Sequence, residues 1–161
     1  MKAFTLIEVL VVALIFSFLA IGITQVMNLG NVVFPVDLGQ MQLQQQTRQA
    51  IQWMTRELRQ ASTDPIDPVI GIGNNRITFD SFGDLGISYY LDTGDANGDG
   101  LVNQIIREFP AGSRRIVANS ITGLTFTFND PLIRIDINAG QTVLGKNLTF
   151  ALVEQVRLRN E

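Results

Sequence analysis

An apolar run near the N-terminus, containing a single carboxylate, constrains this chain more than any other feature. From Phe4 to Thr24 nearly every residue is apolar, and Glu8 is the only charged side chain among them. About 20 such residues form a helix that can cross a hydrocarbon core of about 30 Å. We therefore expect a membrane-spanning segment at residues 4–27, as the first part of an N-terminal helix at residues 4–61.

Glu8 requires an explanation, because an ionised group inside such a segment costs about 2.5 kcal/mol or more unless it is paired. The cations nearby in sequence are Lys2 and the α-amine of a processed chain. A natural partner for Glu8 is therefore an amine supplied by another copy of the same kind of segment. The alternative is an ordinary signal anchor, in which Glu8 merely lies near the membrane interface.

Residues 2–8, Lys-Ala-Phe-Thr-Leu-Ile-Glu, resemble the cleavage and methylation motif of type IV pilins and type II secretion pseudopilins. The resemblance implies that residues 1–3 are a leader, that a prepilin peptidase cuts between Ala3 and Phe4, and that the new amine is methylated. It also implies that Glu8 pairs with a neighbour's N-terminus during filament assembly. The family usually has glycine before the cut, and Ala3 departs from that pattern.

The remaining residues, 62–161, are expected to form one globular domain rich in β-strands. The chain has no cysteine, which excludes a disulfide framework and thiolate metal sites but does not exclude export. Its net charge is −3 and no run of lysine or arginine stands out, so nucleic-acid binding is not expected.

The stretch from Asn28 to Asp37 interrupts the helical pattern. It collects residues that weaken a helix, and Pro35 removes a main-chain hydrogen bond and crowds the preceding turn. We expect a kink or a short melted stretch between these two residues.

Helical periodicity resumes beyond the interruption and gives the helix an apolar face. This face, which should dock on a sheet, consists of Ile51, Met54, Leu58 and Ala61. The opposite face is polar and consists of Gln45, Gln49, Gln52, Arg56 and Arg59. Trp53 and Met54 are both expected to pack in the core.

Short β-branched and aromatic runs follow, separated by Gly, Asn, Asp and Pro. The expected strands are residues 76–79, 86–91, 104–109, 114–118, 121–128, 132–137 and 148–158. Apolar and polar residues alternate most clearly at 124–128 and 133–137, which indicates a sheet with one apolar face. The expected fold class is α+β: a long N-terminal helix whose second half packs on a small antiparallel sheet, the ladle shape of pilins.

Segments further along the chain extend the resemblance to J-class minor pseudopilins and W-type minor pilins. These segments are residues 49–61, 75–79, 87–89 and 156–160. The resemblance implies a minor subunit of a type II secretion pseudopilus near the filament tip, with a type IV pilus minor pilin as a close alternative. It implies other pilin or pseudopilin subunits and the prepilin peptidase as partners. It places the helix in the inner membrane before assembly and the globular domain in the periplasm or outside the cell.

A loop rich in oxygen ligands, residues 92–103, is the one candidate site for chemistry. Side-chain oxygens recur at Asp95, Asn97 and Asp99, the Leu101 carbonyl falls at the seventh position, and Asn103 stands at the ninth. Such a set suits Ca²⁺, and it resembles an EF-hand or dockerin-type loop.

The twelfth position of that loop holds Ile106 in place of the usual acid, so the ligand set is incomplete unless Asp92 or Glu108 contributes. The alternative is a plain polar hairpin loop, because Asn-Gly and Asp-Gly are strong turn formers.

No enzymatic activity is expected, because the chain lacks histidine and cysteine and its lysines and acids show no catalytic spacing. Two function classes stay open. One is a processed filament subunit, and the other is a calcium-binding extracellular module on a permanent anchor that does not polymerise. Glu8 discriminates them, because a mere anchor has no use for a buried carboxylate.

Overall fold

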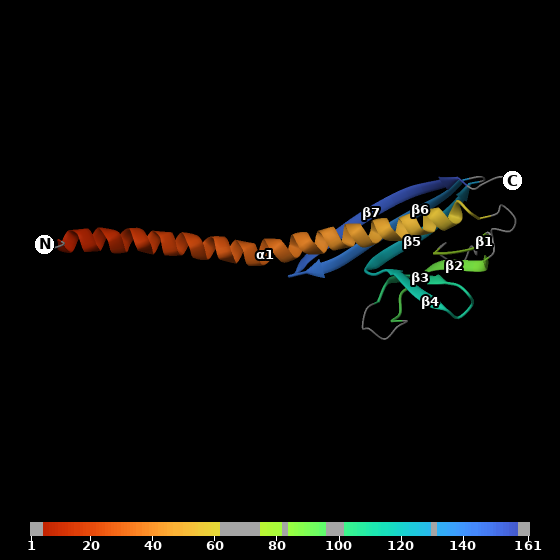
Figure 1. The fold of residues 1–161 in the computed structure, drawn as a ribbon, viewed down its shortest axis with the longest axis horizontal. Helices are drawn as coiled ribbons and strands as arrows, with labels where there is room; N and C mark the ends of the chain where they lie inside the picture. The colour runs from red at the N-terminus through yellow and green to blue at the C-terminus, as the bar shows by residue number, and fades with distance from the viewer. Residues whose placement is uncertain (1–4, 62–74, 82–83, 96–101, 130–131, 158–161) are drawn as a thin grey trace.

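A long helix that carries two antiparallel sheets along its C-terminal half makes up the computed structural model of the chain (Figure 1). The structure describes residues 5–61, 75–81, 84–95, 102–129 and 132–157. The elements are α1 (Leu6–Leu58), β1 (Arg76–Ser81), β2 (Asp84–Asp92), β3 (Gln104–Glu108), β4 (Arg114–Ala118), β5 (Ile121–Asn129), β6 (Leu132–Val143) and β7 (Lys146–Arg157).

Helix α1 is continuous over 53 residues and contains Pro35. Of the two alternatives expected between Asn28 and Asp37, the melted stretch is wrong because the helix is unbroken there, and Figure 1 shows a shallow bend near the middle of the helix. A proline in a helix interior costs about 3 kcal/mol. The helical segments on either side of Pro35 offset that cost. The segment before Pro35 is strongly apolar, and the segment after it begins to pack on the sheets at Gly39.

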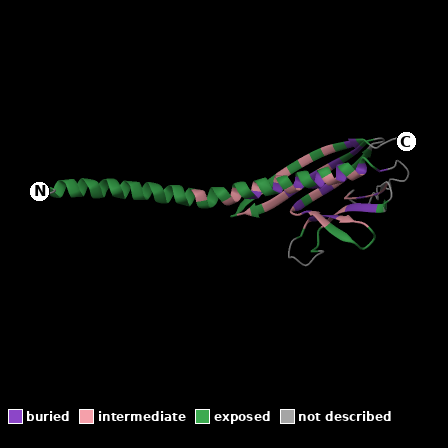
Figure 2. Ribbon diagram, viewed as in Figure 1, coloured by how far each residue is buried: buried purple, intermediate pink, exposed green. Residues whose placement is uncertain are grey.

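The N-terminal half of α1 projects from the globular part with its side chains exposed all round (Figure 2). It is the one described helix long and apolar enough to cross a membrane, with a mean hydropathy of 2.8 over 18 residues. An apolar surface of this size facing water is unfavourable, so this half requires lipid or other apolar helices around it.

The described strands form two sheets in place of the single sheet expected from sequence. The first has the order β1-β2-β3-β4 and the second the order β5-β6-β7, with all neighbours antiparallel. Every expected strand is present. β6 and β7 extend further than expected, as a long hairpin that turns at Leu144 and Gly145, where φ is positive at both residues.

The apolar face of α1 lies in the core, as expected. Ile51, Met54, Leu58 and Ala61 are each at most 5 % exposed. They meet the inward-facing residues of the second sheet, including Leu124, Phe126, Ile133, Ile135 and Ile137. The face predicted to be polar is solvent-exposed throughout. The α+β fold class is thus confirmed.

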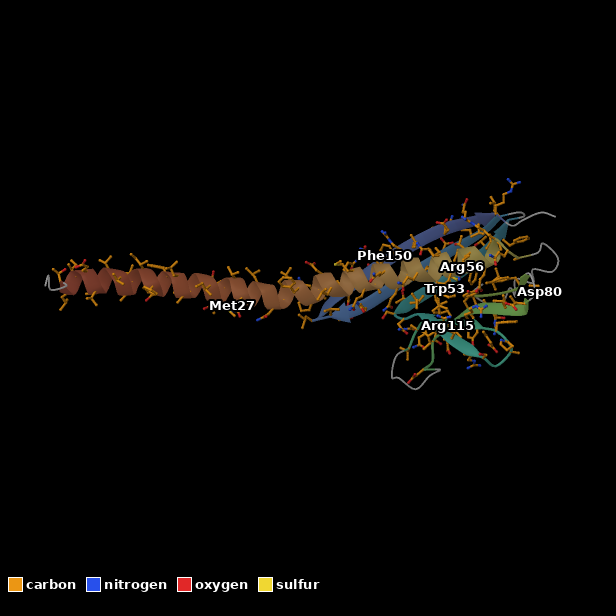
Figure 3. The ribbon with its side chains drawn as sticks, in the orientation of Figure 1. Met27, Trp53, Arg56, Asp80, Arg115 and Phe150 are labelled. Atoms are coloured by element: carbon orange, nitrogen blue, oxygen red, sulfur yellow. The ribbon has the colours of Figure 1, made fainter. Side chains whose placement is uncertain are left out.

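Trp53 does not pack in the core, and that expectation is wrong. It is only partly buried, and its ring lies 4.7 Å from the guanidinium of Arg56 and 4.7 Å from that of Arg115 (Figure 3). One residue along a helix is a rotation of about 100°, so Trp53 cannot share the direction of fully buried Met54. Its ring instead forms cation–π contacts between the helix and β4.

Gly39 marks the point where α1 first meets the second sheet. A Cβ placed on it would lie 2.9 Å from a Val143 methyl and 3.1 Å from a Leu148 methyl. Its carbonyl accepts a hydrogen bond of 2.8 Å from Gln141 Nε2. Glycine therefore allows the helix backbone to approach the β6–β7 hairpin closely.

A buried polar cluster ties α1 to the first sheet. The Glu57 carboxylate accepts two hydrogen bonds from Arg107 Nε, at 3.1 and 3.0 Å, and one from the Tyr89 hydroxyl at 2.7 Å. Burial, together with the Glu57 carboxylate, raises the pKa of Tyr89 far above its usual range. Arg107 and Glu57 are 16 % and 14 % exposed in their side chains, so this ion pair is largely withdrawn from water.

We predict that Tyr89 stays protonated until the domain unfolds in alkali. The folded state holds this proton more tightly than the unfolded state, so the stabilisation is complete below about pH 10 and is lost as the pH rises further. In a Tyr90→Phe variant Tyr89 is the sole tyrosine, and phenolate absorbance should then appear together with loss of the circular dichroism of the sheets. Ionisation near pH 10 in a folded protein would contradict the prediction.

Candidate functional site

The first turn of α1 presents Glu8 on an exposed apolar surface. Three other polar side chains occur in residues 5–24, and each is satisfied within the helix. Thr5 caps the N-terminus by accepting from the Glu8 main-chain N–H at 3.4 Å, and the hydroxyls of Ser17 and Thr24 donate to the carbonyls four residues earlier. Among these described residues, the Glu8 carboxylate alone has no partner.

Glu8 also has a local role that the sequence reasoning missed. Thr5 is the N-cap and Glu8 is the third residue after it, the spacing of a capping box. A carboxylate in the first turn also interacts favourably with the helix dipole. The pattern Thr-x-x-Glu before an apolar run could have shown this. The dipole interaction stabilises the helix start, but in the described residues no hydrogen bond from the Thr5 N–H to the Glu8 carboxylate closes the capping box. The side chain is therefore unpaired in an apolar setting.

Ala3 and Phe4, the residues at the expected cut, lie outside the described residues. The first described residue is Thr5, and α1 begins at Leu6. Cleavage between Ala3 and Phe4 would therefore place the new amine four positions before Glu8 in the sequence. A cation at that position and a carboxylate at Glu8 could pair between neighbouring helices.

The predicted calcium loop joins β2 to β3, and the structure describes its two ends only. Asn97, Asp99 and Leu101 lie outside the described residues, whereas Asp95 and Asn103 lie within them. Asn103 adopts a left-handed conformation, with φ of 63°, and its carbonyl accepts from the Ile121 N–H at 2.8 Å. Within the described ranges, no group of three acidic side chains is placed to hold a metal ion.

The two acids suggested to complete the loop lie in different places. Asp92 ends β2 beside the loop, and its Oδ1 accepts from the Gly94 N–H at 2.9 Å. Glu108 lies at the far end of β3 and accepts from the Gly112 N–H at 2.9 Å and from the Tyr90 hydroxyl at 3.2 Å. The Gly112 hydrogen bond lowers the pKa of Glu108. Glu108 thus holds the β3–β4 turn, and Asp92 is the acid left beside the loop.

The residue at the twelfth loop position, Ile106, is fully buried in β3. It faces Tyr90 in β2 and Ile116 in β4. The described segment after the loop is the strand β3, in the place where an EF-hand has its exiting helix. Gln104, the first residue of this strand, is also buried, and its carboxamide oxygen lacks a hydrogen-bond partner.

Residues 1–24 match the family model of the prokaryotic N-terminal methylation motif. This motif is the hallmark of type IV pilin-like proteins that are cleaved by a prepilin peptidase, and it confirms the resemblance seen in residues 2–8. The chain has no significant match among curated proteins or among solved structures. The motif and the apolar first half of α1 together fit membrane anchoring.

Proposed function

We propose that this chain is a structural minor subunit of a type II secretion pseudopilus, assembled through α1 and located near the filament tip. The observation that carries the proposal is Glu8, an unpartnered carboxylate in a matched methylation motif on an exposed apolar helix. A neighbour's methylated N-terminus would supply the missing cation, and neighbouring helices would cover the apolar surface. Pilin-like proteins are structural, so we assign the chain no catalytic residues.

In this proposal the helix resides in the inner membrane before assembly, with the globular domain in the periplasm or outside the cell. Partners are the prepilin peptidase and other pilin or pseudopilin subunits. A minor pilin of a type IV pilus is the alternative supported by the same motif. Deleting the gene in its host separates the two: loss of protein secretion supports the pseudopilus, whereas loss of surface pili with normal secretion supports the pilus.

We predict that the mature chain begins at Phe4 with a methylated amine. The small Ala3 side chain should permit cleavage, although more slowly than the usual glycine. N-terminal sequencing and the intact mass of protein purified from its host measure both modifications. A variant with Ala3→Gly is the matched control and should be processed at least as fast. An assembled chain that retains Met1 would contradict the prediction.

We further propose that the loop after β2 binds Ca²⁺ through Asp95, Asn97, Asp99, the Leu101 carbonyl and Asn103, with Asp92 as the added acid. The alternation of oxygen ligands along the sequence supports this. The position of Asp92 beside the loop supports it as well. A calcium-binding module that never polymerises is the competing function for the whole chain, and it predicts calcium binding without processing at Phe4.

Calcium should stabilise the domain, because a ligand that binds only the folded state adds about 2.7 kcal/mol at a hundredfold excess over Kd. Ile106 stands where such loops usually have an acidic ligand, so binding should be weak, with Kd of about 10⁻⁴ to 10⁻³ M as in extracellular modules. The melting temperature of the full chain in detergent should rise with calcium and fall with chelator. Asp99→Ala should remove the difference, whereas Asp136→Asn, in β6, should keep it. An unchanged melting temperature at millimolar calcium would favour a plain hairpin loop.

A further inference from the structure

A basic groove lies between α1 and the edge strand β7. It has a volume of about 580 Å³ and is open along one side. Its lining includes Arg48, Thr55, Arg56 and Arg59 from the helix, and Leu152 and Glu154 from the strand. Figure 3 shows Arg56 on α1 in the region where β7 passes beside the helix.

The charge of the groove differs in sign from that of the chain. It brings together three arginines and one glutamate, whereas the whole chain has a net charge of −3. Within the described residues, none of these four side chains forms an ion pair. Arg56 contacts the Trp53 ring, and that contact leaves its charge uncompensated. The groove thus has an unneutralised positive charge that would attract carboxylates.

A second observation at the groove is independent of charge. Thr55 is 9 % exposed and lines the groove, and its hydroxyl is buried without a hydrogen-bond partner. Buried hydroxyls are normally paired, so this covered but unsatisfied hydroxyl is a polar group left without a partner at the wall of the groove.

The free edge of β7 supplies the third observation. β7 is 12 residues long and pairs with β6 alone in the described sheet. Near its start Gln40 Nε2 donates to the Thr149 carbonyl at 3.4 Å. Beyond Thr149, no hydrogen bond from outside the β6–β7 pair reaches the β7 backbone in the described residues. An open edge of this kind is a template for an added strand.

We propose that the groove binds an extended, acidic segment of another protein, which adds as a strand to the free edge of β7. Its main chain would pair with β7, and its carboxylates would lie against Arg48, Arg56 and Arg59. A second copy of this chain fits less well, because pairing two β7 edges would bring two basic grooves together. The inference uses the globular part only and does not depend on filament assembly.

Synthetic peptides of about ten residues, the length of a long strand, test the proposal against the full chain in detergent micelles. One peptide alternates valine with glutamate, and its matched control alternates valine with glutamine. We expect the glutamate peptide to bind about tenfold more tightly or better, with an affinity that falls as salt is added. Hydrogen exchange should slow at the amides of β7 and stay unchanged in the first sheet.

Charge variants separate the groove from the overall charge of the protein. The pair Arg48→Glu and Arg59→Glu should weaken binding of the glutamate peptide about tenfold or more, whereas Arg114→Glu with Arg134→Glu changes the net charge equally and should not. Glu154→Gln removes the one acid of the groove and should tighten binding about two- to fivefold. A damaged fold cannot mimic that gain.

Three outcomes would overturn the proposal. Equal binding of the two peptides would remove the role of the arginines. Inorganic phosphate could bind instead, in a way that depends on Arg48 and Arg59 but does not slow hydrogen exchange in β7. That result would make the groove a small-anion site. If the protein self-associates and the Arg48 and Arg59 variants abolish this self-association, the groove is occupied by a second copy of the chain.

Discussion

Replacing Glu8 with leucine is expected to abolish incorporation of the chain into filaments while leaving its membrane insertion intact or improved. An unpaired carboxylate in an apolar setting costs about 2.5 kcal/mol or more, so its removal favours insertion. The same change removes the only partner that a neighbour's N-terminal amine would find on this surface. Complementation of a deletion strain, with recovery of sheared filaments and of the membrane fraction, measures both effects.

A matched control is available in the same helix. Ser17→Leu also replaces a polar side chain with leucine, but the Ser17 hydroxyl already donates to the Ala13 carbonyl at 2.8 Å. This variant should insert and assemble. The N-cap hydrogen bond of Thr5 uses the main-chain N–H of Glu8 and survives the substitution. Loss of the interaction between the carboxylate and the helix dipole costs about 0.3–1 kcal/mol, which is too little to unfold a helix of this length in a membrane. Normal assembly of Glu8→Leu would favour the permanent anchor over the filament subunit.

Much of the fold could be predicted from sequence because its signals are local. Alternation placed Ile133, Ile135 and Ile137 on the buried face of β6, where each is at most 1 % exposed. Helical spacing placed Met54 and Leu58 in the core, where both are fully buried. Apolar residues recur every second position in a strand and about every 3.6 positions in a helix when one side of the element meets the core. A single sequence is enough to show these patterns.

The parts that sequence reasoning missed depend on partners far away in the chain. β6 and β7 continue through polar residues such as Asn138 and Gln141, because each strand is the pairing partner of the other. Trp53 contacts Arg115, which lies more than sixty positions away in the sequence, so this cation–π contact had no local signal. The division into two sheets and the groove beside β7 likewise arise only when the elements pack together. Propensity alone does not determine such tertiary choices.

The candidate site shows the same division. The motif around Glu8 is contiguous, so it could be recognised from sequence, and the family model matches it over residues 1–24. The choice between Asp92 and Glu108 needed the structure, because β3 carries Glu108 away from the loop and into the β3–β4 turn. Nothing in the sequence indicated that Glu57 would meet Tyr89 and Arg107.

Replacing Glu57 with alanine is expected to destabilise the globular domain by about 3 kcal/mol, the low end for removing one partner of a buried ion pair. The change leaves the Arg107 guanidinium largely buried without its carboxylate and leaves the fully buried Tyr89 without an acceptor. It also removes the polar link between α1 and the first sheet. Equilibrium unfolding of the full chain in detergent, followed by the fluorescence of Trp53, measures the loss.

The exposed ion pair of β6 provides the control. Arg134 donates to Asp136 at 2.8 Å, with side chains that are 49 % and 26 % exposed, so Asp136→Ala should cost less than about 1 kcal/mol. Combining Glu57→Leu with Arg107→Leu and Tyr89→Phe should recover much of the loss, because apolar residues of similar volume can replace a buried ion pair. Equal costs for Glu57→Ala and Asp136→Ala would mean that water still solvates Arg107, and that apolar packing and the contact between Trp53 and Arg115 hold α1 against the first sheet.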